Sequence, residues 1–177
     1  MVHALTIRSS NGIVNCIISD VGVSRPYIEK TETSIQPFRG IWDTGASGSV
    51  ITKNVADKLD IKPTGQRMVN HAQGSDITNT YFVNLVLPSN VTVENVTVME
   101  GKLPEGVDLL IGMDIVTLGD FSITNKDGMT VMSFRIPSMV CHDYVAEANR
   151  QNQINIIRQN ETMRSKQKNI KRKKKNR

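Results

Sequence analysis

The chain has 177 residues, enough for one globular domain with a hydrophobic core and too few for two ordinary domains. Its net charge of +5 is unevenly distributed: residues 146–177 hold eleven basic and two acidic residues, whereas residues 1–145 hold eleven basic and fifteen acidic residues. The basicity therefore belongs to a tail, which excludes a uniformly basic domain. The N-terminus has no signal-peptide core and no segment approaches the roughly 18 apolar residues of a membrane span, so we expect a cytoplasmic protein without membrane contact.

Short β-rich segments separated by turn residues dominate the chain up to residue 136, which predicts an all-β fold. The first two predicted strands are Thr6–Ser9 and Ile13–Ser19. Asn11-Gly12 lies between them and tolerates positive φ, which favours a hairpin. Residues 20–35 are rich in charge and are predicted to form a loop.

A strand at Arg39–Trp42 is predicted to run into a tight turn, and Val50-Ile51 to continue as strand after it. Thr52 is the expected N-cap of a short helix that Pro63 and Gly65 end. The apolar face of this helix is formed by Val55, Ala56 and Leu59.

Strict alternation from Ile77 to Leu87 predicts a long, half-buried strand. Val91–Val98 predicts another strand with a β-bulge at Glu94-Asn95, and Leu109-Leu110-Ile111, apolar on both faces, predicts a fully buried strand. A second short helix is expected near residues 113–118. The last expected hairpin consists of Phe121–Thr124 and Thr130–Ile136, joined by a turn at Lys126-Asp127-Gly128.

From Ala146 onward hydrophobic residues become sparse, and such a segment cannot bury enough apolar surface to fold alone. We therefore predict a domain at residues 1–144 and a basic tail at 145–177, disordered or partly helical, with Glu147–Ile157 as its helical part. The charge would allow weak polyanion contact through residues 146–177. Because no aromatic residue interleaves the charges to stack on bases, a solvated terminus is preferred over nucleic-acid binding.

The most informative motif is Ile41-Trp42-Asp43-Thr44-Gly45-Ala46-Ser47, in which a carboxylate follows an apolar strand on a turn of small residues. Hydrolysis of a peptide by acid–base chemistry needs an ionised carboxylate to deprotonate water and a neutral carboxyl to protonate the substrate. Two carboxyls about 3 Å apart supply both, because like charges that close share one proton. The pair would then titrate as one unit.

An ordinary surface β-turn is the alternative interpretation of Asp43-Thr44-Gly45, since Asp and Gly are common turn residues. The context favours a site. Asp43 follows an apolar strand, and a second apolar run ending in glycine, Leu110-Ile111-Gly112, follows later in the chain.

Together these two motifs resemble the signatures of the retropepsin-like aspartic proteases, and the similarity from about Phe38 to Pro137 is nearest to a bacterial or phage branch of that family. The resemblance implies a closed β-barrel half, one lobe per chain, that forms a homodimer. It implies that Asp43 is catalytic, that Thr44 makes a hydroxyl contact between subunits, and that the strand of the second signature passes behind the catalytic loop. Gly45, Ala46 and Ser47 complete the loop.

The resemblance also implies a β-hairpin flap that closes over a peptide substrate. It should lie between a strand near Met68-Val69 and the strand at Ile77. The expected tip and substrate-binding residues are His71, Ala72, Gln73, Gly74 and Ser75. Gly74 suits a turn with unusual φ.

Two positions depart from viral members of the family. Met113-Asp114 stands where an arginine often follows the glycine, so Asp114 is predicted to be a helix-capping or structural acid. Trp42 is large for its position before the catalytic Asp, and its indole N–H will need a partner if it is buried.

No second Asp-Thr-Gly or Asp-Ser-Gly occurs in the sequence, so one chain carries half a site and a homodimer acting on peptide or protein substrates is predicted. No metal-binding or cofactor motif is present, and none is predicted. Two other functions remain open: a non-catalytic peptide-binding or scaffold module with the same fold, and a polyanion-binding protein that acts through its tail. The retained Asp43-Thr44-Gly45 disfavours the first, and the acidic domain disfavours the second.

Overall fold

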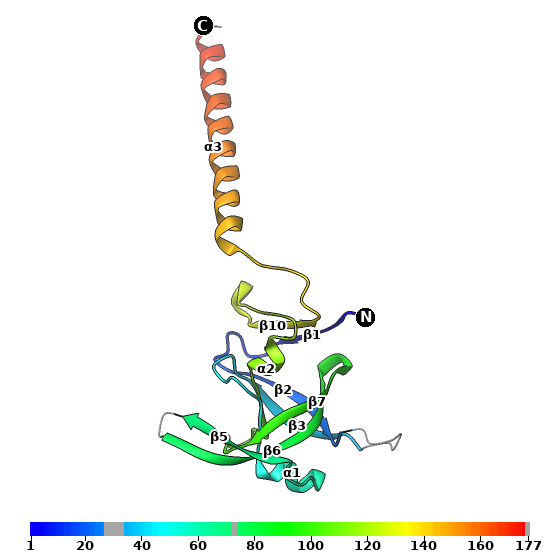
Figure 1. Cartoon of the computed structure of the whole chain (residues 1–177). Helices are drawn as coiled ribbons and strands as arrows, with labels where there is room; N and C mark the ends of the chain where they lie inside the picture. The colour runs from blue at the N-terminus through cyan, green and yellow to red at the C-terminus, as the bar shows by residue number, and fades with distance from the viewer. Residues whose placement is uncertain (27–33, 72–73, 176–177) are drawn as a thin grey trace. The chain divides into compact units, whose positions relative to one another are not determined.

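The computed structural model describes residues 1–26, 34–71 and 74–175 and divides into two units, Met1–Met139 and Val140–Arg177. The first unit is built mostly from strands, and the second contains one helix, α3 (Tyr144–Lys175) (Figure 1). The predicted division into a domain at residues 1–144 and a basic tail at residues 145–177 stays a prediction. Among the described residues, no helix has the length and apolar character needed to cross a membrane.

Six strands of the first unit close into a barrel. Their order is β2-β3-β8-β4-β7-β6, and Gly22–Ser24 of β2 pairs back onto Asn84–Val86 of β6. The closure confirms the predicted all-β, closed-barrel lobe. The strands are β2 (Ile17–Ser24), β3 (Gln36–Trp42), β4 (Val50–Ile51), β6 (Gly74–Leu87), β7 (Val91–Glu100) and β8 (Leu109–Ile111).

A seventh strand, β5 (Gly65–His71), pairs with the first half of β6 and lies at the end of the sheet order. The β5–β6 hairpin extends from the barrel as an arm (Figure 1). The predicted hairpin between Met68 and Ile77 is therefore present.

A separate three-stranded sheet has the order β1-β10-β9, with β1 (His3–Arg8), β9 (Asp120–Thr124) and β10 (Val131–Ile136). The predicted hairpin of Phe121–Thr124 and Thr130–Ile136 is confirmed. The predicted hairpin across Asn11-Gly12 is wrong, because β1 pairs with β10 and β2 pairs with β3. Gly12 does have a positive φ of 80°, but the turn sends the chain from one sheet to the other.

The predicted loop at residues 20–35 is wrong in its first part, because β2 continues to Ser24. The charge at Asp20 misled the prediction: Asp20 is exposed, while Val21 and Val23 beyond it are buried and continue the strand. Residues 27–33 of that predicted loop lie outside the described residues.

Trp42 links the barrel to the three-stranded sheet. Its ring stacks on Phe121 of β9 with centroids 5.8 Å apart and packs at a tilt on Phe134 of β10 at 5.5 Å. The side chain is 7% exposed, and its Nε1–H donates to Ser19 Oγ at 3.1 Å. The expected partner for the buried indole is therefore Ser19, and aromatic packing fixes the end of β3 just before the turn.

The helix after the turn is α1 (Lys53–Leu59), and its buried face consists of the three predicted residues Val55, Ala56 and Leu59. Thr52 occupies the N-cap position, but its hydroxyl makes no capping bond and is buried without a hydrogen-bond partner in the described part of the chain. The helix ends at Leu59, before the predicted Pro63, because Asp60 adopts a left-handed conformation with φ of 48°.

The predicted bulge in the second long strand is confirmed. Val83 pairs with Val96 and Leu85 with Val93, so that Glu94 and Asn95 together oppose one residue, Asn84. Asn84 is buried and its Oδ1 accepts the Asn95 N–H at 2.9 Å. The Asn84 side chain thereby satisfies the Asn95 N–H, a backbone donor that the bulge removes from the β6–β7 hydrogen-bond ladder.

The described part of the unit has three more short helical segments. The first two are η1 (Pro88–Asn90), between β6 and β7, and α2 (Met113–Val116), directly after β8. The second lies at the helix expected near residues 113–118. A third, η2 (Lys126–Gly128), forms the β9–β10 turn, where Asp127 and Gly128 have positive φ.

Candidate active site

The Asp43 turn begins where β3 ends and is held by backbone hydrogen bonds. Asp43 N–H donates to Ile111 O at 2.9 Å, and Ala46 N–H donates to Asp43 O at 3.3 Å. The Asp43 carboxylate is half-exposed, and its Oδ1 accepts the Gly45 N–H at 2.8 Å. The turn therefore presents an oriented carboxylate at the surface of this unit.

The second signature lies directly behind this turn. β8 runs parallel to β3, pairing Trp42 with Ile111, and antiparallel to β4, pairing Val50 with Leu110. β8 thus lies between the two strands that flank the turn. Leu109 and Ile111 are fully buried and Leu110 is half-buried, so this strand supports the Asp43 turn from the core of the barrel.

Two glycines allow close approaches at the site. A Cβ on Gly112 would lie 2.7 Å from both the carbonyl carbon and the oxygen of Gly48, which are backbone atoms that cannot rotate away. A Cβ on Gly45 would lie 3.1 Å from Asp43 Oδ1. The two signatures pack backbone against backbone, and Gly112 makes that possible.

A polar link between the signatures joins Asp114 to Ser49. Ser49 is buried, and it donates its hydroxyl to Asp114 Oδ1 at 2.8 Å and its N–H to Oδ2 at 3.0 Å. Ser49 Oγ also accepts the Gly112 N–H at 3.1 Å. Asp114 is therefore a structural acid, and it ties α2 to the chain segment that follows the Asp43 turn.

The sequence motifs did not identify Ser49 as the hydrogen-bond partner of Asp114. The available signals were an acid two residues after the glycine of the second signature and a serine just before the apolar Val50-Ile51. Neither signal indicates that the two residues, which are 65 positions apart, form a contact.

Asp114→Asn is expected to lower the free energy of unfolding by about 1–3 kcal/mol, because one amide N–H would face a donor, either Ser49 N–H or Ile115 N–H. Urea unfolding measures the loss. In a double-mutant cycle with Ser49→Ala, the combined loss should be smaller than the sum of the single losses, since both changes break one network. Additive losses would contradict the link.

The surface beside the turn is open. Thr44 and Gly45 are exposed, and a hollow of about 410 Å³ lies between the turn and α2. Its lining residues are Thr44, Gly45, Ala46, Ser47, Met113, Asp114 and Thr117. The four predicted support residues therefore gather on one accessible face next to Asp43.

The predicted flap residues lie at the end of the β5–β6 hairpin. His71 pairs with Gly74 and Asn70 with Ser75, and Gly74 has a φ of 135°. Ala72 and Gln73, two of the five predicted tip residues, lie outside the described residues. A role of this hairpin over a substrate stays a prediction.

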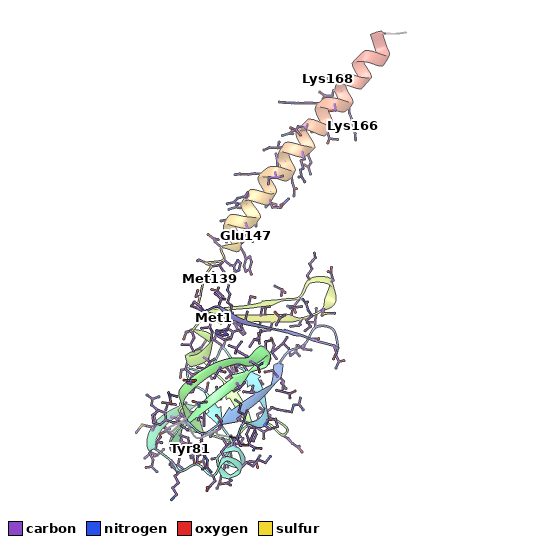
Figure 2. The ribbon with its side chains drawn as sticks, turned by 90° about the vertical axis from the view of Figure 1, so that its right-hand side faces the viewer. Met1, Tyr81, Met139, Glu147, Lys166 and Lys168 are labelled. Carbon is purple, nitrogen blue, oxygen red and sulfur yellow. The ribbon has the colours of Figure 1, made fainter. Side chains whose placement is uncertain are left out.

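A polar cluster holds the root of the hairpin. Tyr81 (labelled in Figure 2) donates its hydroxyl to Glu100 Oε2 at 2.5 Å, and Asn79 donates to the same oxygen at 3.2 Å. Burial, followed by the hydrogen bond and the charge of Glu100, raises the pKa of Tyr81 to about 12. The phenol therefore stays a neutral donor throughout the physiological range and keeps β6 bonded to β7.

Comparisons with known proteins agree with this geometry. A family model described as Aspartyl protease matches residues 31–115, a range that contains both the Asp43 turn and the second signature. No curated protein sequence matches the chain.

Among solved structures, the chain is similar to a retropepsin-like aspartic protease from Rickettsia conorii, at 17% identity and a TM-score of 0.50, covering 77% of this chain and 96% of that one. It also matches EIAV protease in complex with the inhibitor HBY-793, at 16% identity and a TM-score of 0.44, covering 61% and 90%. The simian foamy virus (mac) protease matches at 15% identity and a TM-score of 0.37, covering 55% of this chain and 91% of that one. The two viral likenesses, with TM-scores below 0.5, add no weight.

The Rickettsia likeness identifies the fold, and the family model covers the stretch of chain that forms the Asp43 turn and its support. The bacterial or phage branch stays a prediction. The chain therefore has the fold of the retropepsin-like aspartic proteases, and its residues 31–115 match the Aspartyl protease family model.

Proposed function

We propose that this chain is an aspartic endopeptidase whose active site forms when two copies pair and bring their Asp43 carboxylates together. The observation that carries the proposal is the Asp43 turn: an oriented, half-exposed carboxylate at the end of the partly buried strand β3, in a chain with one Asp-Thr-Gly. Family and fold support a protease function in general, and the paired site is what this chain would need to perform it.

In the proposed reaction, the two Asp43 carboxyls of the dimer share one proton, because two negative charges about 3 Å apart repel strongly. The ionised carboxylate takes a proton from a water molecule, which attacks the carbonyl carbon of the peptide. The neutral carboxyl gives its proton to the carbonyl oxygen. The carboxyl that took the proton from water then gives it to the leaving nitrogen, and the C–N bond breaks. One hydroxyl of the tetrahedral intermediate returns its proton to the other carboxylate as the carbonyl re-forms, so the pair again holds one proton.

The neighbouring groups have supporting roles in this proposal. Gly45 N–H, bonded to Asp43 Oδ1, orients the carboxylate. The exposed Thr44 hydroxyl is available to bond across the dimer, and the β5–β6 hairpin, with its predicted tip residues His71 to Ser75, would cover the bound peptide. In this proposal the second signature, Leu110-Ile111-Gly112, supports the turn from behind through the pairing of β8 with β3.

A mixing experiment tests the shared site. Adding a tenfold excess of Asp43→Asn chains to the wild type, with time for exchange, should reduce activity by about tenfold, because random pairing places most wild-type chains in mixed dimers. Hydrolysis of a peptide selected from a library measures the activity. An equal excess of wild-type chains is the control and should raise the activity.

The same assay on serial dilution gives a second readout. Specific activity should fall over the concentration range in which size-exclusion chromatography shows dimers separating into monomers. Specific activity that is unchanged where only monomers remain would contradict the paired site and would require one chain to hold a complete site.

A further inference from the structure

The C-terminal unit concentrates the positive charge of the molecule. Residues 140–177 contain eleven basic and three acidic residues, a net charge of +8, whereas residues 1–139 contain eleven basic and fourteen acidic residues, a net charge of −3. The positive charge of the molecule is thus gathered in the C-terminal unit, and the β-rich unit is mildly acidic.

Helix α3 begins with its own local signals. Asp143 Oδ1 accepts the N–H groups of Val145 and Ala146, both at 3.0 Å, and Asp143 O accepts the Glu147 N–H at 3.0 Å. His142 stacks on Tyr144 with ring centroids 5.8 Å apart. An Asp at the N-cap fixes where the helix starts.

Helix α3 is uncovered along the part whose side chains the structure describes, residues 144–168. Every residue from Tyr144 to Lys168 is exposed, including its few large apolar side chains: Ile156 is 57% exposed, Ile157 58% and Met163 60%. Lys166 and Lys168 project from the helix (Figure 2). A helix that is polar on all sides gains nothing from core packing, and packing supplies most of the stability of helices in proteins.

The charge rises toward the end of the helix. Eight of its ten Lys and Arg residues lie from Arg164 onward, and no acidic residue follows Glu161. Like charges three or four positions apart destabilise a helix by roughly 0.2–0.5 kcal/mol per pair. A polyanion would remove this repulsion, so anion binding and helix formation should favour one another.

The residue types select among polyanions. Insertion into an anionic membrane surface needs a broad apolar face with Trp, Phe or Leu, and none of these residues occurs after residue 144. Binding of single-stranded nucleic acid relies on aromatic residues that stack on bases, and residues 145–177 contain none. A duplex needs neither, because Lys, Arg, Asn and Gln can bind its phosphates.

Helix dimensions narrow the choice further. An α-helix about 10–12 Å wide fits the B-DNA major groove, which is about 12 Å wide, and the 32 residues of α3 would span about 48 Å. The deep major groove of duplex RNA is too narrow to admit an α-helix. We propose that α3 binds duplex DNA, without sequence preference, through contacts between its basic residues and the phosphates.

The proposal is tested with the full-length chain carrying Asp43→Asn, so that its outcome does not depend on protease activity. Fluorescence anisotropy measures binding to a labelled DNA duplex as salt rises from 50 to 200 mM. If about six phosphates are neutralised, affinity should fall about 10³-fold over this range, with a slope near −5 in a log–log plot.

Charge-removal variants locate the surface. Changing Lys166, Lys168 and Lys171 to Gln should reduce the slope by about three, because three phosphate contacts are lost. Gln and Lys have similar helix propensities, so the helix itself should tolerate the change. The matched control changes Lys62, Lys102 and Lys126, lysines of the β-rich unit, to Gln and should leave affinity and slope unchanged.

Binding of other polyanions, measured in the same way, tests whether duplex DNA is the preferred partner of α3. Single-stranded DNA, duplex RNA, phosphatidylserine vesicles and poly-glutamate should each bind more weakly than duplex DNA at equal salt. Circular dichroism of the full-length chain should show a gain in helix on adding the duplex, and the triple tail variant should show a smaller gain. Equal binding of poly-glutamate, vesicles or another nucleic acid would overturn the proposal, as would absence of binding at 50 mM salt or an unchanged slope in the tail variant.

Discussion

Asp43→Asn is expected to lower peptide hydrolysis by at least about 10³-fold while leaving the fold and the proposed dimer in place. The amide can neither take a proton from water nor hold the proton that the paired carboxyls would share. The fold should survive because the Asn side-chain oxygen can still accept the Gly45 N–H that Asp43 Oδ1 accepts at 2.8 Å. Cleavage of a peptide library by variant and wild type, side by side, measures the loss.

The matched control is Asp127→Asn in the β9–β10 turn. Asp127 is exposed and has a φ of 58°, a conformation that Asn also tolerates, so this variant should keep wild-type activity and stability. Statine-type peptides, which mimic the tetrahedral intermediate, should bind the wild type and lose affinity for Asp43→Asn. Activity of Asp43→Asn within tenfold of the wild type would remove Asp43 from the chemistry and the protease proposal with it.

Gly112→Ala should be the most damaging change in the support behind the turn. The added Cβ would lie 2.7 Å from the Gly48 carbonyl carbon and oxygen, so β8 and the Asp43 turn must move apart. Overpacking of this kind costs about 1–3 kcal/mol of unfolding free energy. Activity should fall further, by about 100-fold, because a displacement of about 1 Å at a catalytic group has an effect of that size.

Urea unfolding and peptide hydrolysis of the same preparation separate the two effects. Gly65→Ala at the start of β5 is the control, since its Cβ would meet only the Thr80 Oγ1 at 3.3 Å, a contact that a small side-chain movement relieves. Backbone conformation does not confuse the comparison, because Gly112 has an ordinary φ of −94°. A Gly112→Ala protein with wild-type stability and activity would show that the close approach to Gly48 is dispensable.

The sequence was most informative where a feature depends on neighbouring residues. The buried face of α1 at Val55, Ala56 and Leu59 follows from helical spacing, and the long β6 strand follows from alternation. The Glu94-Asn95 bulge interrupts that alternation in β7 and was visible for the same reason. Each of these features depends on the pattern of side chains in a short segment and not on what that segment packs against.

The sequence-based predictions were wrong where the same turn or capping residue is compatible with more than one structure. Asn11-Gly12 is a good turn, but a turn does not determine whether the next strand pairs with the previous one, and β1 pairs with β10 instead. Thr52 is a good N-cap residue, yet its hydroxyl makes no capping bond. Turn and cap chemistry fixes backbone conformation at a few residues, and packing of the rest decides which partner is used.

The sequence by itself determined the family signatures, a mostly-β lobe and the single Asp-Thr-Gly turn, because these depend on residue types at fixed short spacings. Only the tertiary structure decided that β2 closes the barrel on β6, that Trp42 reaches Phe121 and Phe134, and that Ser49 bonds to Asp114 across 65 residues. Strand edges offer equivalent backbone donors and acceptors to many partners. The choice among them is made by the simultaneous burial of side chains from distant segments, and that is a property of the whole packed core.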